Sequence, residues 1–112
     1  MKRIEDFKVR LMSDLLKAKR KNDGLIIGIG AATKGNTLLN FCKIDRSLVD
    51  FVTDGSPLKI GKYMPGSNIP IYSDDKVGGS VKYALILPWN IASFLKDKFK
   101  KKRLKFIIPE FK

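Results

Sequence analysis

The sequence of 112 residues predicts a single α/β domain, built on a parallel sheet of four to five strands with helices on both faces. Two observations support this fold class. Segments with apolar residues at helical spacing alternate with short apolar runs that are bounded by glycine or proline. In addition, a chain of this length with 44% hydrophobic residues can bury one core but has no room for a second.

A basic amphipathic helix is expected over residues 1–23. Apolar residues recur there at spacings of three and four, and these are Ile4, Phe7, Leu11 and Leu15. Lys and Arg fill many of the positions between them. The helix is predicted to end at Asn22-Asp23-Gly24, because glycine readily adopts the left-handed conformation that closes helices.

The strands of the sheet are predicted from five segments: residues 25–30, 48–54, 69–72, 81–87 and 105–109. The first segment contains only apolar residues and glycine, as in strands that are buried on both faces. The third is expected to be a short edge strand, because it contains Pro70 and a sheet tolerates proline at its edge. Residues 58–68 are expected to form an ordered loop between the second and third strands.

Two further helices are expected between the strands. One covers about residues 34–42. The other opens at Pro88-Trp89-Asn90 and is predicted to carry its apolar residues on one face, namely Ile91, Phe94, Leu95 and Phe99. Because helices and strands alternate along the chain, the strands should run parallel, and ligands should bind at their carboxyl ends.

The formal net charge of +12 is concentrated near the two ends of the chain. Residues 1–22 carry eight Lys or Arg against three acids, and residues 96–112 carry eight against two. We interpret these cations as the solvated faces of terminal helices. A basic protein that binds nucleic acid or another macromolecule is kept as the second alternative function, although we consider nucleic acid an unlikely partner.

Composition also narrows the chemistry that we expect. No apolar run is long enough to cross a membrane, so we predict a soluble, cytoplasmic chain without a membrane partner. A single cysteine, Cys42, excludes an internal disulfide. With one cysteine and no histidine, the usual zinc ligand sets are missing and we predict no metal site. Hydrolytic chemistry within the chain would have to use carboxylates or lysines, and we predict no catalytic residue in it.

The glycine-containing stretch GIGAATKGNTLLN, residues 28–40, is predicted to bind phosphate. It follows the first strand, so its turn leads into the N-terminus of a helix, where backbone amides and the helix dipole favour an anion. Gly28 and Gly30 would let the backbone approach a ligand closely, and Lys34 would add a positive charge. The structural alternative is that these glycines only pack the helix onto the strand.

Known nucleotide motifs fit this stretch incompletely. The dinucleotide pattern G-x-G-x-x-G has Thr33 in place of its third glycine, although Asp54 lies near the position expected for an acid that binds a ribose. A nucleotide- or NAD-binding module is therefore the first alternative function. The P-loop pattern fails because Lys34 precedes Gly35, and the common S-adenosylmethionine pattern is absent as well.

Four motifs in order carry a more specific resemblance: GIGAATKGNTLLN, VDFVTDGSPLKIGKYMPGSNIPI, YALILPWN and KFIIPEF. Together they resemble the C-terminal domain of bacterial sugar C-methyltransferases, from about Leu25 to Phe111. The resemblance implies a Rossmann-like domain over residues 25–111, preceded by the helix of residues 1–23, in a single domain of residues 1–112. Enzymes of this family methylate ketosugars carried on a nucleoside diphosphate, in deoxysugar, antibiotic and surface-polysaccharide pathways.

The family resemblance also implies what this chain lacks. In the family, a middle domain binds S-adenosylmethionine and supplies the catalytic residues, and an N-terminal part holds zinc. We find no counterpart of either in this sequence. The chain is therefore expected to face the sugar nucleotide without catalysing methylation by itself, and to work with a companion methyltransferase chain or with domains that carry the S-adenosylmethionine and the zinc.

The resemblance and the glycine turn together predict the residues that line the sugar-nucleotide cleft: Gly28, Gly30, Ala31, Ala32, Lys34, Gly35, Asn36, Asp54, Pro57, Lys59, Tyr63, Asn68, Pro88, Trp89 and Asn90. Lys34 and the helix amides would offset the diphosphate charge. Residues 57–66 would form a loop over the end of the second strand.

Several of these residues have a structural interpretation as well. Trp89 is a typical core residue, Lys59 and Lys62 are typical surface charges, and Asn90 is a typical helix cap. Family members often have histidine at the position of Asn68. Asparagine forms hydrogen bonds but carries no proton at neutral pH, so an acid-base role is not expected there.

Overall fold

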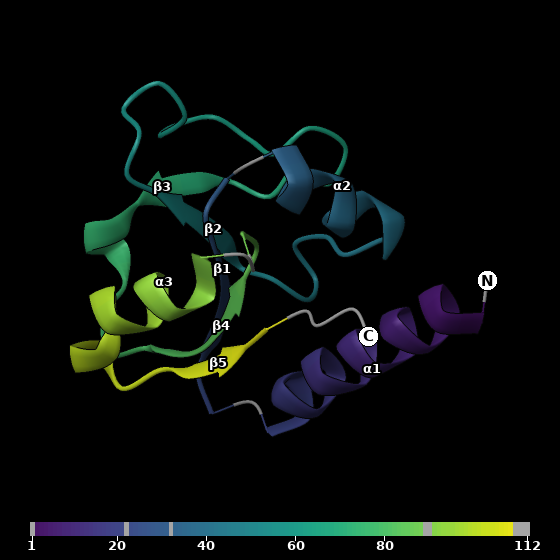
Figure 1. Cartoon of the computed structure of the whole chain (residues 1–112). Helices are drawn as coiled ribbons and strands as arrows, with labels where there is room; N and C mark the ends of the chain where they lie inside the picture. Colours follow the sequence, from purple (N-terminus) through teal and green to yellow (C-terminus); the bar gives the residue numbers. More distant parts are fainter. Residues whose placement is uncertain (1, 22, 32, 89–90, 109–112) are drawn as a thin grey trace.

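The computed structural model describes residues 2–21, 23–31, 33–88 and 91–108 (Figure 1). Its elements are α1 (Lys2–Lys21), β1 (Leu25–Ile29), α2 (Thr33–Phe41), β2 (Phe51–Asp54), β3 (Ile71–Ser73), the 3₁₀ turn η1 (Asp74–Lys76), β4 (Val81–Ile86), α3 (Ala92–Lys98), the 3₁₀ turn η3 (Lys100–Lys102) and β5 (Lys105–Ile107). The predicted α/β fold is confirmed.

All strand pairs in the sheet are parallel, and the strand order is β3-β2-β1-β4-β5. The chain adds β2 and β3 on one side of the central strand β1 and then crosses over to place β4 and β5 on the other side. Parallel sheets with such a reversal of strand order bind ligands outside the carboxyl ends of their strands. The predicted edge strand lies at an edge of the sheet, as β3.

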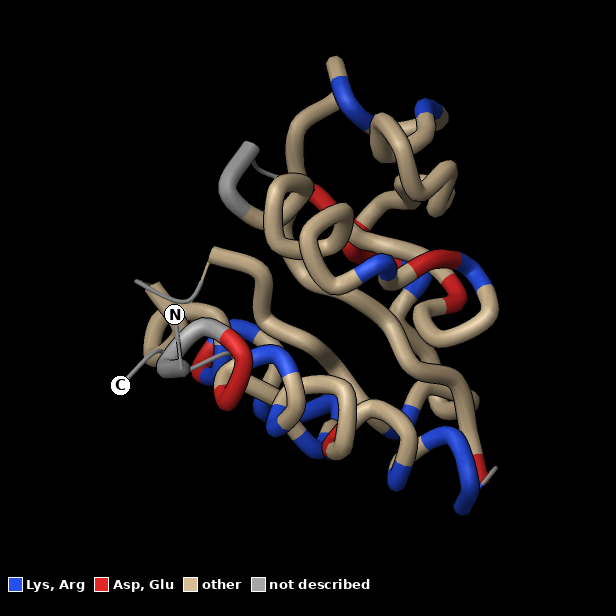
Figure 2. Tube along the Cα trace, turned by 90° about the vertical axis from the view of Figure 1, so that its right-hand side faces the viewer, with Lys and Arg blue, Asp and Glu red and all other residues tan. Residues whose placement is uncertain are grey.

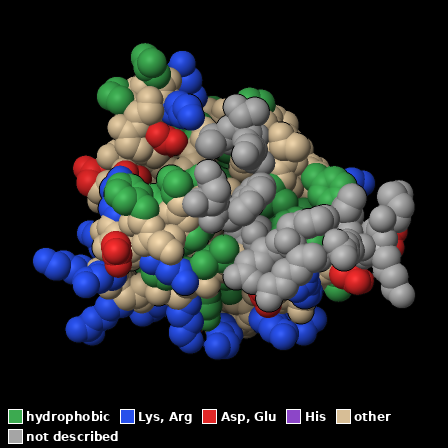
Figure 3. Space-filling model, viewed as in Figure 1, with side chains coloured by type: hydrophobic (Ala, Val, Ile, Leu, Met, Phe, Trp, Pro, Cys, Tyr) green, Lys and Arg blue, Asp and Glu red, His purple; other side chains and the backbone are tan. Residues whose placement is uncertain are grey.

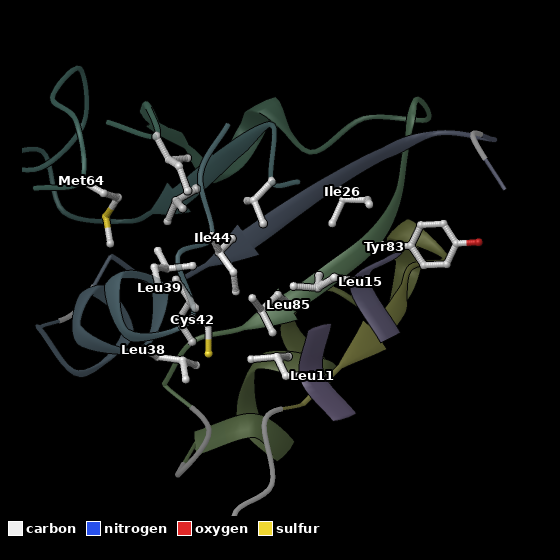
Figure 4. Close-up of a cluster of buried hydrophobic side chains, with 14 of the residues drawn as sticks. Leu11, Leu15, Ile26, Leu38, Leu39, Cys42, Ile44, Met64, Tyr83 and Leu85 are labelled. Carbon is white, nitrogen blue, oxygen red and sulfur yellow. The ribbon is translucent and has the colours of Figure 1, made fainter. Parts of the chain in front are cut away.

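Hydrophobic cores lie on both faces of the sheet. On one face α1 and α2 pack against the sheet, where Leu11, Leu15, Leu39 and Leu85 are among the buried side chains (Figure 4). On the other face the sheet is covered by α3, whose Leu95 packs in the second core (Figure 1). Successive β1 residues therefore point into different cores, which explains why this strand is apolar on both faces.

The second strand begins later than predicted, at Phe51 instead of residue 48. The preceding residues form a turn in which the Val49 N–H donates to the Asp45 carbonyl oxygen over 3.0 Å. The Asp50 carboxylate then accepts a hydrogen bond from the Ile26 N–H over 2.9 Å. At the start of the β1–β2 pairing, this carboxylate accepts a hydrogen bond that a backbone carbonyl oxygen would otherwise accept. The pattern of apolar residues along the sequence does not predict such a bond.

The predicted apolar face of the last helix is only half buried. Leu95 and Phe99 are in the core, whereas Ile91 and Phe94 are exposed. Ile91 is the N-cap residue and makes no side-chain cap hydrogen bond, and Phe94 is turned about 100° around the helix from Leu95. In a helix of seven residues, one short stripe meets the sheet and the neighbouring apolar residues face outward.

No helix among the described residues is long and apolar enough to cross a membrane.

Candidate functional site

The turn between β1 and α2 is connected by two hydrogen bonds to the end of β2 and by one to the loop that follows β2. The Gly30 N–H donates to the Thr53 carbonyl oxygen over 2.8 Å. The Ala31 N–H donates to the Asp54 carboxylate over 2.8 Å, and the Lys59 ammonium donates to the Ala31 carbonyl oxygen over 2.9 Å. The N–H and the carbonyl oxygen of Ala31 are therefore both bound by side chains, those of Asp54 in β2 and of Lys59 in the following loop. The turn is thus preformed.

Both oxygens of the Asp54 carboxylate accept hydrogen bonds from backbone N–H groups of the same chain. One oxygen accepts from Ala31, and the other accepts from the Ser56 N–H over 2.8 Å in an Asx turn. These bonds explain an aspartate at this position without a ligand. A carboxylate oxygen can accept a second hydrogen bond, so substrate binding by Asp54 stays a prediction.

Gly30 meets Pro88 across the carboxyl ends of β1 and β4. Its φ of 91° is in the region that favours glycine, and a Cβ atom there would lie 2.6 Å from the Pro88 Cδ. Two residues predicted for the cleft, from distant parts of the sequence, are therefore in direct contact. Glycine suits this position for two reasons: its φ is positive, and Pro88 leaves no room for a Cβ atom.

Gly28 and Gly35 are packing positions. A Cβ on Gly35 would lie 2.6 Å from the Leu87 Cβ, and one on Gly28 would lie 3.1 Å from the Val52 Cγ2. Gly35 lets α2 approach Leu87, which follows β4, and Gly28 lets the side chains of Val52 and Leu87 approach β1. The structural alternative considered for the glycine stretch accounts for both of them.

A pocket of about 430 Å³ lies beside the β1–α2 turn, between the start of α2 and the loop that follows β2. Its lining residues are Ala31, Asn36, Leu58, Lys59, Lys62, Tyr63, Met64, Pro65 and Ile71. The structure therefore brings together four residues from the predicted set: Ala31, Asn36, Lys59 and Tyr63. In the space-filling view, hydrophobic and basic side chains gather on this loop, at the top left (Figure 3).

Four apolar lining residues are absent from the predicted set of cleft residues: Leu58, Met64, Pro65 and Ile71. Met64 and Ile71 are buried, whereas Leu58 is exposed at the rim. The loop turns back on itself, since the Met64 N–H donates to the Ile69 carbonyl oxygen over 2.8 Å. Apolar and basic residues alternate within the loop, and this was the only pattern in the sequence that could indicate a lining role. It does not predict that the loop folds back on itself.

The pocket has the chemistry of an anion site with an apolar floor. Two ammonium groups, those of Lys59 and Lys62, line it, and none of the described lining residues is acidic. The Asn36 Oδ1 is buried and has no hydrogen-bond partner within the described part of the chain. The pocket also lies at the first turn of α2, where the helix dipole favours negative charge.

The loop over the pocket is fixed by its own backbone and by α2. The Asn40 side-chain amide donates to the Pro65 carbonyl oxygen over 3.0 Å. Asn68 has a φ of 60°, a left-handed conformation that asparagine tolerates, and its N–H donates to the Met64 carbonyl oxygen. Asn68 is not among the lining residues, so the structure gives this predicted site residue a conformational role.

The remaining predicted residues lie apart from this pocket or outside the described part of the chain. Pro57 is exposed in the loop and does not line the pocket. Ala32, Trp89 and Asn90 lie outside the described residues, and so does the side chain of Lys34. Their predicted roles stay predictions.

Cys42 does not provide a reactive group for this site. It is buried in the core between the sheet and the helices α1 and α2, and burial raises the pKa of its thiol, while the nearby Lys8 ammonium opposes this shift. The thiol is therefore neutral at physiological pH. Within the described ranges, no three His, Cys, Asp or Glu side chains come together as a metal site would require.

Comparison with known proteins identifies the family. Residues 1–109 match the family model of the C-methyltransferase C-terminal domain. The chain belongs to this family. The match includes α1, which lies before the sequence motifs that indicated the resemblance.

A curated relative supports the same conclusion. The chain is similar to the C-methyltransferase NovU of Streptomyces niveus, with 40% identity over 88 residues. The match covers 75% of this C-methyltransferase C-terminal domain but 21% of NovU. The chain thus spans about a fifth of the length of this relative.

Proposed function

We propose that this C-methyltransferase C-terminal domain binds the nucleoside diphosphate-sugar substrate of a sugar C-methyltransferase. The observation that carries the proposal is the pocket beside the β1–α2 turn, which combines two lysines, an apolar floor and Asn36, whose buried Oδ1 has no partner among the described residues. A sugar nucleotide offers a matching set of groups. It has two phosphates, several hydroxyl groups and a planar base.

Among the side chains that the structure describes, Lys59 is well placed to bind the diphosphate. One N–H of its ammonium donates to the Ala31 carbonyl oxygen, which holds the side chain at the pocket. An ammonium group has three donors, so two are available to phosphate oxygens. The Asn36 Oδ1 would accept a hydrogen bond from a sugar hydroxyl or from the base, which would satisfy a buried acceptor.

The methyl transfer itself would depend on residues outside this chain. Adding a methyl group to carbon requires a base that removes a proton from that carbon and a bound methyl donor, which we expect to be S-adenosylmethionine. This chain has no histidine, and its cysteine is buried and protonated. We therefore assign the catalytic base, the methyl donor and the zinc to a companion chain or to further domains, and the reaction to cytoplasmic deoxysugar or polysaccharide synthesis.

Calorimetry on the purified chain tests this function. We expect thymidine or uridine diphosphate-glucose to bind, and Lys59→Ala to weaken binding about tenfold, which corresponds to the loss of one charge-assisted hydrogen bond. Lys76→Ala changes an exposed lysine in η1, outside the pocket lining, and should leave the affinity unchanged.

Three outcomes would contradict the proposal. Tight binding of S-adenosylmethionine by this chain would place the methyl donor here. Preference for NAD over both sugar nucleotides would favour a dinucleotide-binding module. Equal affinity of Lys59→Ala and the wild-type chain would exclude the pocket as the diphosphate site.

A further inference from the structure

A closed ring of hydrogen bonds connects Asp54 with Lys59. One Asp54 carboxylate oxygen accepts from the Ala31 N–H, and the Ala31 carbonyl oxygen accepts from the Lys59 ammonium. The other carboxylate oxygen accepts from the Ser56 N–H, and the Ser56 carbonyl oxygen accepts from the Lys59 N–H over 3.1 Å. Asp54 is therefore connected both to the backbone of Lys59 and to the tip of its side chain.

The position of the Lys59 ammonium matters because cations are scarce at the pocket. The chain carries many Lys and Arg residues along α1 (Figure 2), whereas the described lining of the pocket includes two, Lys59 and Lys62. Lys59 is exposed, and ordering a long lysine side chain costs conformational entropy. A side chain that is already held in place before the ligand arrives binds it more tightly.

The Ala31 carbonyl oxygen is where the ammonium is held, and Asp54 helps to fix it there. The turn has another anchor, since the Gly30 N–H donates to the Thr53 carbonyl oxygen. That bond joins two backbone groups, so a change of the Asp54 side chain leaves both of its partners in place. Loss of the Asp54 carboxylate should therefore move the acceptor of Lys59 without removing the turn.

The chemistry of the ring requires a carboxylate. An aspartate has two acceptor oxygens, one for the Ala31 N–H and one for the Ser56 N–H, whereas an asparagine has one. Asparagine also forms Asx turns, so its oxygen would bind Ser56 and its NH₂ group would face the Ala31 N–H. A negative charge beside a diphosphate weakens binding by repulsion, so charge alone does not explain an acid at this position.

We infer that Asp54 is a positioning residue, which holds the Lys59 ammonium where it binds the diphosphate of a sugar nucleotide. The inference rests on the proposed function of the pocket. It gives Asp54 an indirect role in binding, through Lys59, in place of the predicted contact with the ligand itself.

The first measurement is made without ligand, by NMR relaxation at the lysine Cε atoms. Relaxation of this kind reports how ordered a side chain is on the ps–ns timescale. We expect the wild-type Lys59 Cε to be more ordered than the Cε of Lys76, an exposed lysine in η1. In Asp54→Asn, the Lys59 order parameter should fall to that of Lys76.

The second measurement is a double-mutant cycle, in calorimetry with thymidine diphosphate-glucose. Asp54→Asn should weaken binding about fivefold, because the ammonium is no longer held, although loss of the negative charge by itself would strengthen binding. In the Lys59→Ala background the same substitution should cause no further weakening, since no ammonium is left to position.

Asp45→Asn is the matched control. Asp45 also accepts a hydrogen bond from the N–H two residues further on, that of Ser47, but it does not line the pocket. This substitution should leave both the affinity and the order of Lys59 unchanged. Circular dichroism and thermal unfolding check that Asp54→Asn is folded, as the remaining bond between Gly30 and Thr53 predicts.

Three results would overturn the positioning role. The first is an unchanged order parameter of Lys59 in Asp54→Asn, and the second is unchanged or tighter binding by this variant. The third is an equal further loss in the Lys59→Ala background, which would mean that Asp54 contacts the ligand directly. If the wild-type chain binds no sugar nucleotide, the proposed function fails, and the order of Lys59 still decides whether Asp54 holds the ammonium.

Discussion

The β1–α2 turn and the outer face of α1, the side of this helix that points away from the core, are both basic, but they are organised in opposite ways. At the turn, the N–H and the carbonyl oxygen of Ala31 both have partners within the chain, and Gly30 fits against Pro88. On the outer face of α1, Val9 and Leu16 expose apolar surface. The backbone groups of the turn are thus held within the chain, whereas the outer face of the helix leaves apolar side chains exposed to solvent.

The largest expected effect separates the two faces of α1. Leu15 is completely buried, and Leu15→Ala should lower the free energy of unfolding by about 3–5 kcal/mol through the cavity it creates. Leu16→Ala, one position along on the outer face, should change it by less than about 0.5 kcal/mol. Urea denaturation measures both. Equal losses would mean that the outer face is also packed against the domain.

The second largest effect tests how closely Gly30 of the β1–α2 turn packs against Pro88. Gly30 and Gly61 both have positive φ, 91° and 88°, but a Cβ on Gly30 meets Pro88 whereas one on Gly61 meets nothing within 4 Å. We expect Gly61→Ala to lower the free energy of unfolding by about 1–2 kcal/mol from backbone strain. Gly30→Ala should lower it by about 2–4 kcal/mol, because crowding is added to strain. Equal losses in urea denaturation would show that the contact with Pro88 is loose.

The smallest effect concerns an exposed turn that repeats the chemistry of Asp54 away from the pocket. The Asp45 Oδ1 accepts hydrogen bonds from the Ser47 hydroxyl over 2.6 Å and the Ser47 N–H over 2.9 Å, and these bonds lower the pKa of the Asp45 carboxyl. A lowered folded-state pKa contributes stability above the ordinary pKa of aspartate, and the contribution is lost as the pH falls through the folded-state pKa.

The Asp45 effect is measured by an NMR titration of its carboxyl carbon. The midpoint in the wild-type chain should lie below the midpoint in Ser47→Ala, which lacks the hydroxyl donor. Identical midpoints would show that the Ser47 hydroxyl does not bind the Asp45 carboxylate in solution.

Much of the fold was predictable because its signals are local. The apolar run of β1, the spacing of apolar residues in α1 and the proline near β3 each reflect one element and its burial. The predictions for β2 and α3 were partly wrong for a different reason. The Asp50 carboxylate that pairs with Ile26, and the side of α3 that meets the sheet, depend on tertiary contacts.

The candidate site was predictable to a similar extent. The motifs identified Ala31, Asn36, Lys59 and Tyr63, which line one pocket although they come from separate segments. Spacing also singled out Asp54, but it does not reveal that both carboxylate oxygens bind backbone amides. Met64 and Ile71 were missed because the pocket floor depends on how the loop folds back, which side-chain patterns along the sequence do not specify.

The most direct test of the central claim is an NMR map of the isolated chain titrated with thymidine diphosphate-glucose. If the pocket binds the sugar nucleotide, the amide signals of residues 31–36 and 58–64 should shift together, and the signals of Val9 and Leu16 should stay in place. Shifts confined to α1, or no shifts around the pocket at saturating ligand, would contradict the account.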